Sequence, residues 1–365
     1  MLPNKEELKI RSEKTKLRRA RPAKQVGGHG VSLRELAAHL GLSLTTVSRV
    51  MNHAAKEYRI APATQQRVLE AAASLNYHPN AFARGLRKKR SSTVGVIVPE
   101  ISEGYAASVL SGIEDALLQE KFFYFVVSHR HRADLLDEYP RLLLSRAVEG
   151  IIAVDTRLLG PVPVPVVAVS GHRRKNGVLT IELDHLTAAR YALSHLFDLG
   201  HRKIAFIKGQ TFSSDTRSRW DATVKVCDSL GIRIDPQLVT QLEGIAPGSE
   251  PGYVATRELL QRERRFSAIV CFNDASAIGA ITALHEAGLV VPHDVSVVGF
   301  DDIPAAATIR PALTTVRQPL YEMGRTAAMS LLSLIREEIS LSPLRSILIT
   351  PDFVTRQSTA IVSKD

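Results

Sequence analysis

Cysteine is scarce in this sequence of 365 residues, which holds only Cys227 and Cys271. Two cysteines are too few for the disulfide framework of a secreted scaffold or for a cysteine-rich zinc site. Because free cysteine is among the most often buried residue types, we expect both to be core residues. The shortage indicates a protein of a reducing compartment.

Long apolar runs are also missing. No segment approaches the roughly 18 consecutive apolar residues that a membrane helix requires. Residues 5–24 are polar and charged, without the apolar stretch of about 7–15 residues of a secretory signal. We therefore expect a soluble, cytoplasmic protein with no membrane partner.

Motifs of common catalytic chemistries are absent as well. The sequence contains no GxxxxGK[ST], HExxH or GxSxG, and no GxGxxG after an expected strand. His and Asp are scattered, and none is grouped with a nucleophile. The sequence therefore predicts a protein that is not an enzyme and has no metal site and no cofactor.

Positive charge, in contrast, is plentiful and confined to one region. The net charge is +10, yet residues 1–90 hold 19 Lys and Arg against 6 Glu, and the remainder holds 28 bases against 31 acids. Neutralisation of phosphates supplies most of the sequence-independent affinity for DNA. This asymmetry predicts a polyanion-binding module joined to a nearly neutral body, with residues 1–30 as a flexible basic arm.

Three short helices are expected after this arm. Leu33, Leu36, Ala37 and Leu40 recur at helical spacing, Gly41 interrupts the pattern, and it resumes with Leu44, Val47 and Val50. Ser32, with Glu35 three residues later, predicts a capping box for the first helix, and Ser43 predicts the cap of the second. A third helix is expected from Pro62 to about Asn76, with Val68, Leu69, Ala72 and Leu75 facing inward. The pattern is helix, tight turn, helix.

The second helix, "SLTTVSRVMN", has two unlike faces. One is an apolar stripe, and the other carries Thr45, Thr46, Ser48 and Arg49. A helix in the DNA major groove needs this division, because one stripe holds it on its scaffold while small hydroxyl and basic side chains reach base edges and phosphates.

The segments "LAAHLGLSLTTVSRVMN" and "ATQQRVLEAAASLNYHPNAFARGLRKKRSSTVGVIVP" resemble the headpiece and hinge of the LacI/GalR family of bacterial transcription regulators. The resemblance implies that Leu44, Thr45 and Arg49 read operator bases. It implies that Ser43, Thr46, Ser48 and Asn52 contact or order the phosphate backbone. The loop from Asn52 to Thr64 is about three residues longer than is usual in the family, so Lys56 or Arg59 could add a phosphate contact or the third helix could shift.

The resemblance also predicts a hinge helix in residues 79–91. Asn80 would cap it, and a helix this short is marginal in water, so it should fold only on DNA. Paired hinge helices of two subunits would insert Leu86 into the minor groove as a wedge, with Arg84 and the following bases near phosphates.

The body, 92–365, alternates apolar strands with helical segments, which is typical of a doubly wound α/β fold. Strands are expected at 93–99, 122–128, 150–155, 164–170, 203–209, 267–274 and 295–302, separated by helices at about 105–120, 132–147, 185–199, 216–230, 251–263, 275–288 and 319–338.

The resemblance implies that this body is periplasmic-binding-protein-like, with two doubly wound subdomains behind a small all-α headpiece of residues 31–78. The first lobe would span about 92–184 and 318–342, and the second about 185–315 and 346–360. A small molecule would bind in the cleft between the two lobes.

Effector contacts are carried over residue by residue. Arg219 takes the place of an arginine that clamps a sugar or carboxylate, and Asn273 and Asp301 match polar contacts. Phe272 or Phe300 could form an apolar wall. The first lobe departs from the family pattern, so Ser102, Glu103, Tyr105 and Ser170 are its expected contributions. Arg, Asn and Asp together suit a cyclic polyol, although a nucleobase stays open as the alternative.

These features predict a homodimeric repressor, associated with the nucleoid, that binds a pseudo-palindromic operator and is switched by a small molecule. Whether the effector induces or co-represses stays open. A solute-binding receptor would fit the body alone, but the basic headpiece and the lack of a signal segment argue against it.

Overall fold

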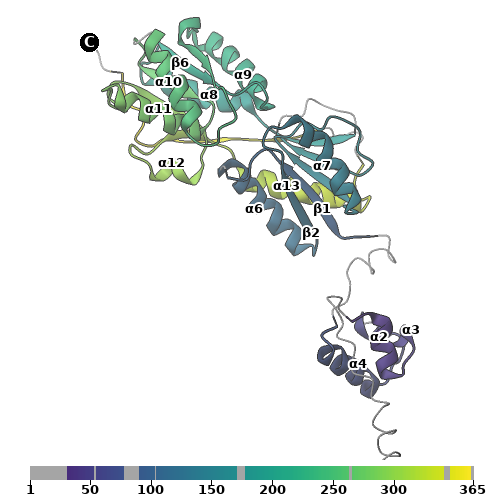
Figure 1. Ribbon diagram of the computed structural model, residues 1–365. Helices are drawn as coiled ribbons and strands as arrows, with labels where there is room; N and C mark the ends of the chain where they lie inside the picture. The colour runs from purple at the N-terminus through teal and green to yellow at the C-terminus, as the bar shows by residue number, and fades with distance from the viewer. Residues whose placement is uncertain are drawn as a thin grey trace, which may run out of the picture. The chain divides into compact units, whose positions relative to one another are not determined.

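The computed structural model describes residues 31–52, 55–77, 90–102, 104–170, 177–262, 265–340 and 346–362. The chain divides into two compact units, Met1–Arg84 and Gly85–Asp365, named here the headpiece and the body. Figure 1 follows the chain through the headpiece and then through the two lobes of the body.

The headpiece contains the three expected helices, α2 (Leu33–Leu40), α3 (Leu44–Met51) and α4 (Pro62–Ser74). The predicted capping box is present, because Ser32 N donates to Glu35 Oε2 at 2.7 Å and Glu35 N donates to Ser32 Oγ at 3.2 Å. Gly41 ends α2 in the left-handed region, at a φ of +64°. Ser43 Oγ then caps α3 by accepting from Thr46 N at 3.0 Å. The predicted helix–turn–helix is confirmed.

One small core holds these helices together. Leu36, Val47 and Val68 are fully buried in it, and short alanines of α4 let the helices approach closely. Leu69 was expected to face inward, but its side chain is 45% exposed. The buried side of α4 is formed by Val68, Ala71 and Ala72, so the helix is rotated slightly from the expected orientation.

The first lobe of the body is a parallel sheet with the strand order β11-β5-β4-β3-β1-β2. Its strands are β1 (Thr93–Val98), β2 (Phe123–Ser128), β3 (Gly150–Val154), β4 (Val166–Val169), β5 (Val178–Leu183) and β11 (Ser346–Ile349). Helices α6 (Gly104–Gln119) and α13 (Leu320–Ile335) pack into one hydrophobic cluster with this sheet, and α7 (Ala133–Ser145) packs into another (Figure 1). The lobe is therefore doubly wound, as expected.

The second lobe repeats this plan with the order β12-β10-β9-β8-β6-β7, in which only β12 is antiparallel. Its strands are β6 (Ile204–Lys208), β7 (Val239–Gln241), β8 (Ala268–Cys271), β9 (Ser296–Asp301), β10 (Thr314–Arg317) and β12 (Asp352–Val354). Helices α8 (His185–Asp198) and α9 (Asp215–Leu230) pack together over one face, and α10 (Glu250–Arg262) and α11 (Asp274–Glu286) over the other (Figure 1). The 3-10 turn η2 (Pro236–Leu238) and the short α12 (Pro304–Thr308) complete it.

Three chain crossings join the lobes. The first follows β5 at Asp184, and the second separates β10 from α13, as the sequence predicts. The third lies between β11 and β12, which corrects the expected second lobe. Residues 346–349 pair in parallel with Thr180–Leu183 of the first sheet. The composition of a short apolar strand such as "SILI" does not say which sheet it joins, because this depends on which strand edge lies beside it.

Candidate functional site

Helix α3 presents the side chains expected to meet DNA. Leu44 is 49% exposed and Thr45 is also exposed, so both stand free of the headpiece core. Thr46 Oγ1 lies 2.8 Å from Ser43 Oγ, and the two hydroxyls form one capped corner at the start of α3. Of the face predicted from the sequence, Thr45 is exposed and Thr46 and Arg49 are half-buried. Ser48 is buried, so the prediction was wrong for Ser48.

Ser48 and Asn52 lie at the inner edge of this face. Ser48 is buried, and Asn52 Nδ2 donates to Ser48 O at 2.7 Å and to Ser48 Oγ at 3.2 Å. These contacts fasten the last turn of α3. The guanidinium of Arg49 lies over the ring of Tyr58, with 3.6 Å between Cζ and the ring centroid. Sequence reasoning missed Tyr58, which stands in the long loop after α3.

Asn80, Arg84, Leu86 and Glu103 lie outside the residues that the structure describes. The same holds for the expected hinge helix except for residues 90 and 91. The predictions made for these positions stay predictions.

A cleft between the two lobes gathers the carboxyl ends of several strands. Tyr105 and Asp155 line it from the first lobe, and Arg219, Asn273 and Asp301 line it from the second. Phe272 belongs to the same wall. The expected contacts from the second lobe are thus brought together with one expected contact from the first. Ligands of parallel α/β sheets bind at this end of the strands.

Two other expected contacts lie elsewhere. Ser102 is exposed, is not part of the wall, and its N–H contacts Glu100 Oε1 at 3.4 Å. Ser170 is buried behind the wall, where its Oγ lies 3.0 Å from Tyr105 Oη. Ser170 therefore supports two residues of the cleft, because its hydroxyl contacts Tyr105 and also hydrogen-bonds Asp215, which lowers the pKa of that carboxyl.

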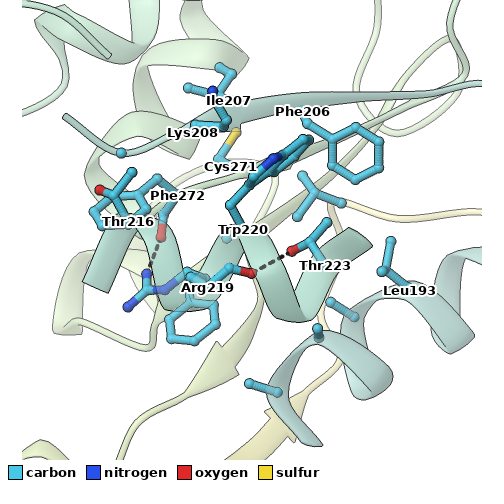
Figure 2. Close-up of a pocket in the computed structure, with 17 residues that line it drawn as sticks. Leu193, Phe206, Ile207, Lys208, Thr216, Arg219, Trp220, Thr223, Cys271 and Phe272 are labelled. Atoms are coloured by element: carbon cyan, nitrogen blue, oxygen red, sulfur yellow. Dashed lines mark hydrogen bonds between the residues drawn. The ribbon is translucent and has the colours of Figure 1, made fainter. Parts of the chain in front are cut away.

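Arg219 is held by its surroundings before any ligand binds. Its Nη1 donates to the carbonyl oxygen of Phe272 (Figure 2), and its Nη2 lies 3.6 Å from Asp215 Oδ2. Its Cζ lies 3.6 Å from the ring centroid of Phe300 and 4.4 Å from that of Phe272. Behind it, α9 and α8 enclose an apolar hollow with Trp220 and Leu193 (Figure 2). The guanidinium is thus largely engaged by the protein itself.

Asp215 is the anionic partner of this arginine. It is buried, and burial alone would raise its pKa, but the hydrogen bond and charge of His185 and the charge of Arg219 lower the pKa below its ordinary value. His185 Nε2 lies 3.7 Å from Asp215 Oδ1. Asp215 is therefore an ionised carboxylate at neutral pH.

Asp301 has the opposite electrostatic character. Burial, the first cause, and the nearby Asp274 raise its pKa well above the ordinary value, against the opposing effects of Arg219 and of Gln318, whose Nε2 donates to Asp301 Oδ1 at 2.6 Å. Its φ is +115°, a conformation that costs about 1–3 kcal/mol in a residue other than glycine. Such strain is kept only where the surrounding structure holds it, and it clusters at ligand sites.

Asn273 contributes to the cleft mainly as a donor. It caps α11, and its Oδ1 accepts from Ser276 N at 2.8 Å. Because this bond uses the amide oxygen, the two N–H groups of the side chain are what it offers to a ligand.

Asp155 is one of the cleft residues that sequence reasoning missed, together with Asp215, His131 and Phe212. It follows β3 and reaches across to the start of α9, where it accepts from Ser214 N at 3.2 Å, from Ser214 Oγ, and from Ser213 Oγ at 3.4 Å. Burial, followed by the charge of Asp215, raises its pKa to about 7. It could have been found from "GIIAVD", in which a carboxylate ends a buried strand.

An aromatic pair also joins the lobes at the cleft. His131 follows β2, and its ring centroid lies 4.0 Å from that of Phe212, which precedes α9. The ring planes are inclined by 36°. Among the described residues, no group of three His, Cys, Asp or Glu could hold a metal ion, and no helix is long and apolar enough to cross a membrane.

Comparison with known proteins decides what this pairing of headpiece and cleft is. The family described as bacterial regulatory proteins, lacI family, matches residues 32–80, and the periplasmic binding protein-like domain matches residues 193–359. The repressor PurR of Haemophilus influenzae is 32% identical over 338 residues, which cover 90% of this chain and 98% of that relative. The chain belongs to the LacI family. It is a LacI-type transcriptional repressor and not an enzyme.

Two solved transcription regulators have folds similar to that of this chain. A lac repressor dimer bound to operator and the anti-inducer ONPF is 26% identical, with a TM-score of 0.79 over 91% of this chain and 100% of that chain. The regulator CelR in complex with cellobiose is 27% identical, with a TM-score of 0.67 over 90% of this chain and 99% of that one.

Proposed function

We propose that this repressor acts as a homodimer on a pseudo-palindromic operator and that a neutral, hydroxyl-rich molecule of the sugar class switches its operator affinity. The observation that carries the choice of effector is the charge of the cleft. Three acidic side chains surround the guanidinium of Arg219. Asp215 is ionised, whereas burial raises the pKa of Asp155 to about 7 and that of Asp301 well above its ordinary value. The guanidinium already bonds to Phe272 and lies beside Asp215. Among the described residues that line the cleft, the one guanidinium is therefore already engaged, whereas the hydroxyl groups of a sugar can donate to the carboxylate of Asp215 and accept from the protonated carboxyl of Asp301.

Unsatisfied polar atoms support the same class of ligand. Arg219 Nε and Gln318 Oε1 are buried without a hydrogen-bond partner among the described residues. A buried polar atom left unpaired costs about 1–3 kcal/mol. Arg219 lines the cleft and Gln318 lies behind it, bonded to Asp301, so a polyol hydroxyl that accepts from Arg219 would satisfy the donor of this pair. The CelR structure, which holds cellobiose, agrees with this class.

A planar nucleobase is the second candidate for the effector. The pair of His131 and Phe212 presents aromatic faces at the cleft, and Phe272 lies in its wall. Offset stacking of aromatic rings contributes about 0.5–1.5 kcal/mol beyond the buried area. An effector of this kind would act as a co-repressor.

On the DNA side, we propose that Leu44, Thr45 and Arg49 read bases while Ser43, Thr46, Ser48 and Asn52 order the start and end of α3. Exposure supports this division, because Leu44 and Thr45 stand free and Ser48 is buried. The lac repressor, to which the fold is similar, was solved as a dimer on its operator, which supports a two-headpiece complex here.

The switch requires the two lobes to change their relation when the effector binds. Asp155 spans the cleft to Ser213 and Ser214, so a ligand that takes over its acceptor positions alters a contact between the lobes. A ligand shifts such an equilibrium only by its differential affinity for the two states.

The test is a thermal-shift screen of the full-length protein with neutral mono- and disaccharides, sugar acids and nucleobases. Neutral sugars are expected to raise the melting temperature, sugar acids to leave it unchanged, and the same sugars to change operator affinity. Stabilisation by sugar acids alone would contradict the charge argument, and stabilisation by nucleobases alone would favour the second candidate.

A further inference from the structure

The loop after α3 places an aromatic ring against the arginine of the recognition helix. In the described part of this loop, residues 55–60, Tyr58 is 51% exposed, yet the Cζ of Arg49 lies only 3.6 Å from the centroid of its ring. At this distance the guanidinium is in van der Waals contact with the ring face. Among the described residues, no carboxylate lies within ion-pair distance of Arg49, so Tyr58 is its evident partner.

The loop is built to hold this ring in place. Ala55 is buried in the headpiece core, and Ile60 packs against the same core. Ile60 N donates to Ala55 O at 3.1 Å, and Gln65 Nε2 donates to Ile60 O at 2.7 Å, which fixes the loop to α4. Arg59 adopts a φ of +49° between these anchors. Tyr58 is therefore carried at the tip of a closed turn.

Stacking on a ring leaves the useful edge of an arginine free. The five N–H donors of guanidinium lie in its plane, whereas the contact with Tyr58 uses its face. The ring also restricts the rotamers of the long Arg side chain before DNA binds. The entropy that this side chain would lose on binding DNA is therefore smaller. A guanidinium held in this way can donate two parallel hydrogen bonds. In the major groove, the matching pair of acceptors is O6 and N7 of guanine.

We propose that Tyr58 is a positioning residue for operator recognition and that it sets the base preference of Arg49 by stacking on its guanidinium. This rests on the proposed role of Arg49 as a base-reading residue. The long loop would then contribute to base specificity through Tyr58, in addition to any phosphate contact of Lys56 or Arg59. The base pair concerned is a G·C pair in each half-site.

The experiment is a selection of bound sequences from random double-stranded DNA with the full-length protein, followed by affinity measurements on the selected operator and its single-base variants. Arg49→Ala identifies the base pair whose preference depends on Arg49. Tyr58→Ala is expected to weaken the preference at that same base pair by about 2- to 5-fold per half-site, the range of an exposed cation–π contact. Tyr58→Phe, which keeps the ring, is expected to retain the preference.

Two further variants separate positioning from other effects. Tyr58→Leu keeps apolar bulk in the loop without a π face, and it should behave as Tyr58→Ala does. Lys56→Ala is the matched control in the same loop; it should lower affinity for all sequences alike and reduce the salt dependence, without changing any base preference. Thermal unfolding of each variant checks that the headpiece stays folded.

Each outcome has a defined meaning. If Arg49→Ala alters no base preference, the proposed reading role of Arg49 fails and the inference fails with it. If Arg49→Ala flattens one position and Tyr58→Ala leaves that position unchanged, only the inference is overturned. Loss of preference in Tyr58→Phe would assign the effect to the hydroxyl, and tighter binding by Tyr58→Ala would mean that the ring withholds Arg49 from DNA; both overturn it.

Discussion

The recognition helix and the cleft differ in how their polar side chains are held. On α3, the backbone is regular, Leu44 and Thr45 stand in solvent, and the nearby hydrogen bonds only cap the helix. In the cleft, Asp301 is buried, has a φ of +115° and has a raised pKa. A helix surface needs little support to expose a side chain, whereas a buried carboxylate needs a dedicated framework.

This difference has a consequence for substitution. A side chain on an exposed helix face can change without destabilising the fold, because surface substitutions are usually within about 0.5 kcal/mol. A buried ion pair does not tolerate such a change, because removal of one partner leaves the other charge buried and uncompensated, which destabilises the fold. We therefore expect substitutions on the exposed face of α3 to leave the headpiece folded, and substitutions of buried cleft residues to destabilise the body.

The largest expected effect is that of Arg219→Ala in the cleft. Loss of one partner of a buried ion pair destabilises a fold by about 3–5 kcal/mol. Because Arg219 also lines the cleft and holds Asp215, the operator response to effector should be lost while operator affinity without effector is kept. Titration of operator binding with effector measures both. A retained response would place the effector elsewhere.

Arg217→Ala provides the control on the same helix. The Arg217 side chain is 75% exposed, and its Nε lies 3.7 Å from Asp221 Oδ2, its ion-pair partner among the described residues. It is expected to leave the effector response intact. Equal damage by both variants would mean that α9 tolerates no substitution, and the comparison of buried with exposed positions would fail.

A smaller effect is expected in the framework beneath the cleft. Asp274 is buried and accepts from Thr315 Oγ1 at 2.5 Å and from Ile303 N at 2.9 Å. Thr315→Val removes one donor at nearly constant shape, so the free energy of unfolding should fall by about 1–3 kcal/mol. Chemical denaturation measures this loss. Thr308→Val, at an exposed threonine of α12, should change the free energy of unfolding by no more than about 0.5 kcal/mol. A loss as large as that of Thr315→Val would contradict the expected difference between buried and exposed threonines.

The charge state of Asp155 gives a pH-dependent prediction. Its pKa is raised to about 7 by burial first and then by Asp215, so the folded protein keeps a proton that the unfolded chain releases near pH 4. The free energy of unfolding contributed by this group is complete below about pH 4 and is lost as pH rises through about 7.

Asp155→Asn removes this titration. The stability of the variant relative to the parent chain is expected to increase by about 1 kcal/mol or more between pH 4 and pH 7 and then to level off. Denaturation of both proteins at several pH values measures the difference. If the free energies of unfolding of the two proteins change with pH in parallel, the pKa of Asp155 is not raised by its burial.

The same contrast explains what the sequence could predict. The caps at Ser32 and Ser43 are local patterns, and both are present as expected. The exposed face of α3 is present except at Ser48, which is buried because Asn52 Nδ2 and the end of the helix pack onto it. Strand β10 was missed because it reads "TTVR": Thr314 and Thr315 are fully buried, and their hydroxyls are satisfied by Thr359 and Asp274. Hydropathy cannot reveal a buried polar strand whose partners lie far away in the chain.

The cleft was predictable where strand ends carry recognisable residues, as at Asn273 and Asp301. Its cross-lobe contacts were not, because Asp155 and Ser214 are 59 residues apart and meet only when both lobes have folded. The placement of β11 failed for a similar reason, since its partner β5 is fixed by the fold and not by the composition of "SILI".

The smallest expected effect is on α3, where Thr45→Ala should change base preference more than it changes the salt dependence of binding. The lost contact is a single hydrogen bond or methyl contact, which contributes about 0.5–1.5 kcal/mol per half-site. Thr46→Ala is the matched control, because Thr46 Oγ1 contacts Ser43 in the cap, and it should weaken binding to all sequences alike. Affinities for operator variants at several salt concentrations separate the two. A reduced salt slope for Thr45→Ala with unchanged base preference would assign Thr45 to the backbone and leave Leu44 and Arg49 as the reading residues.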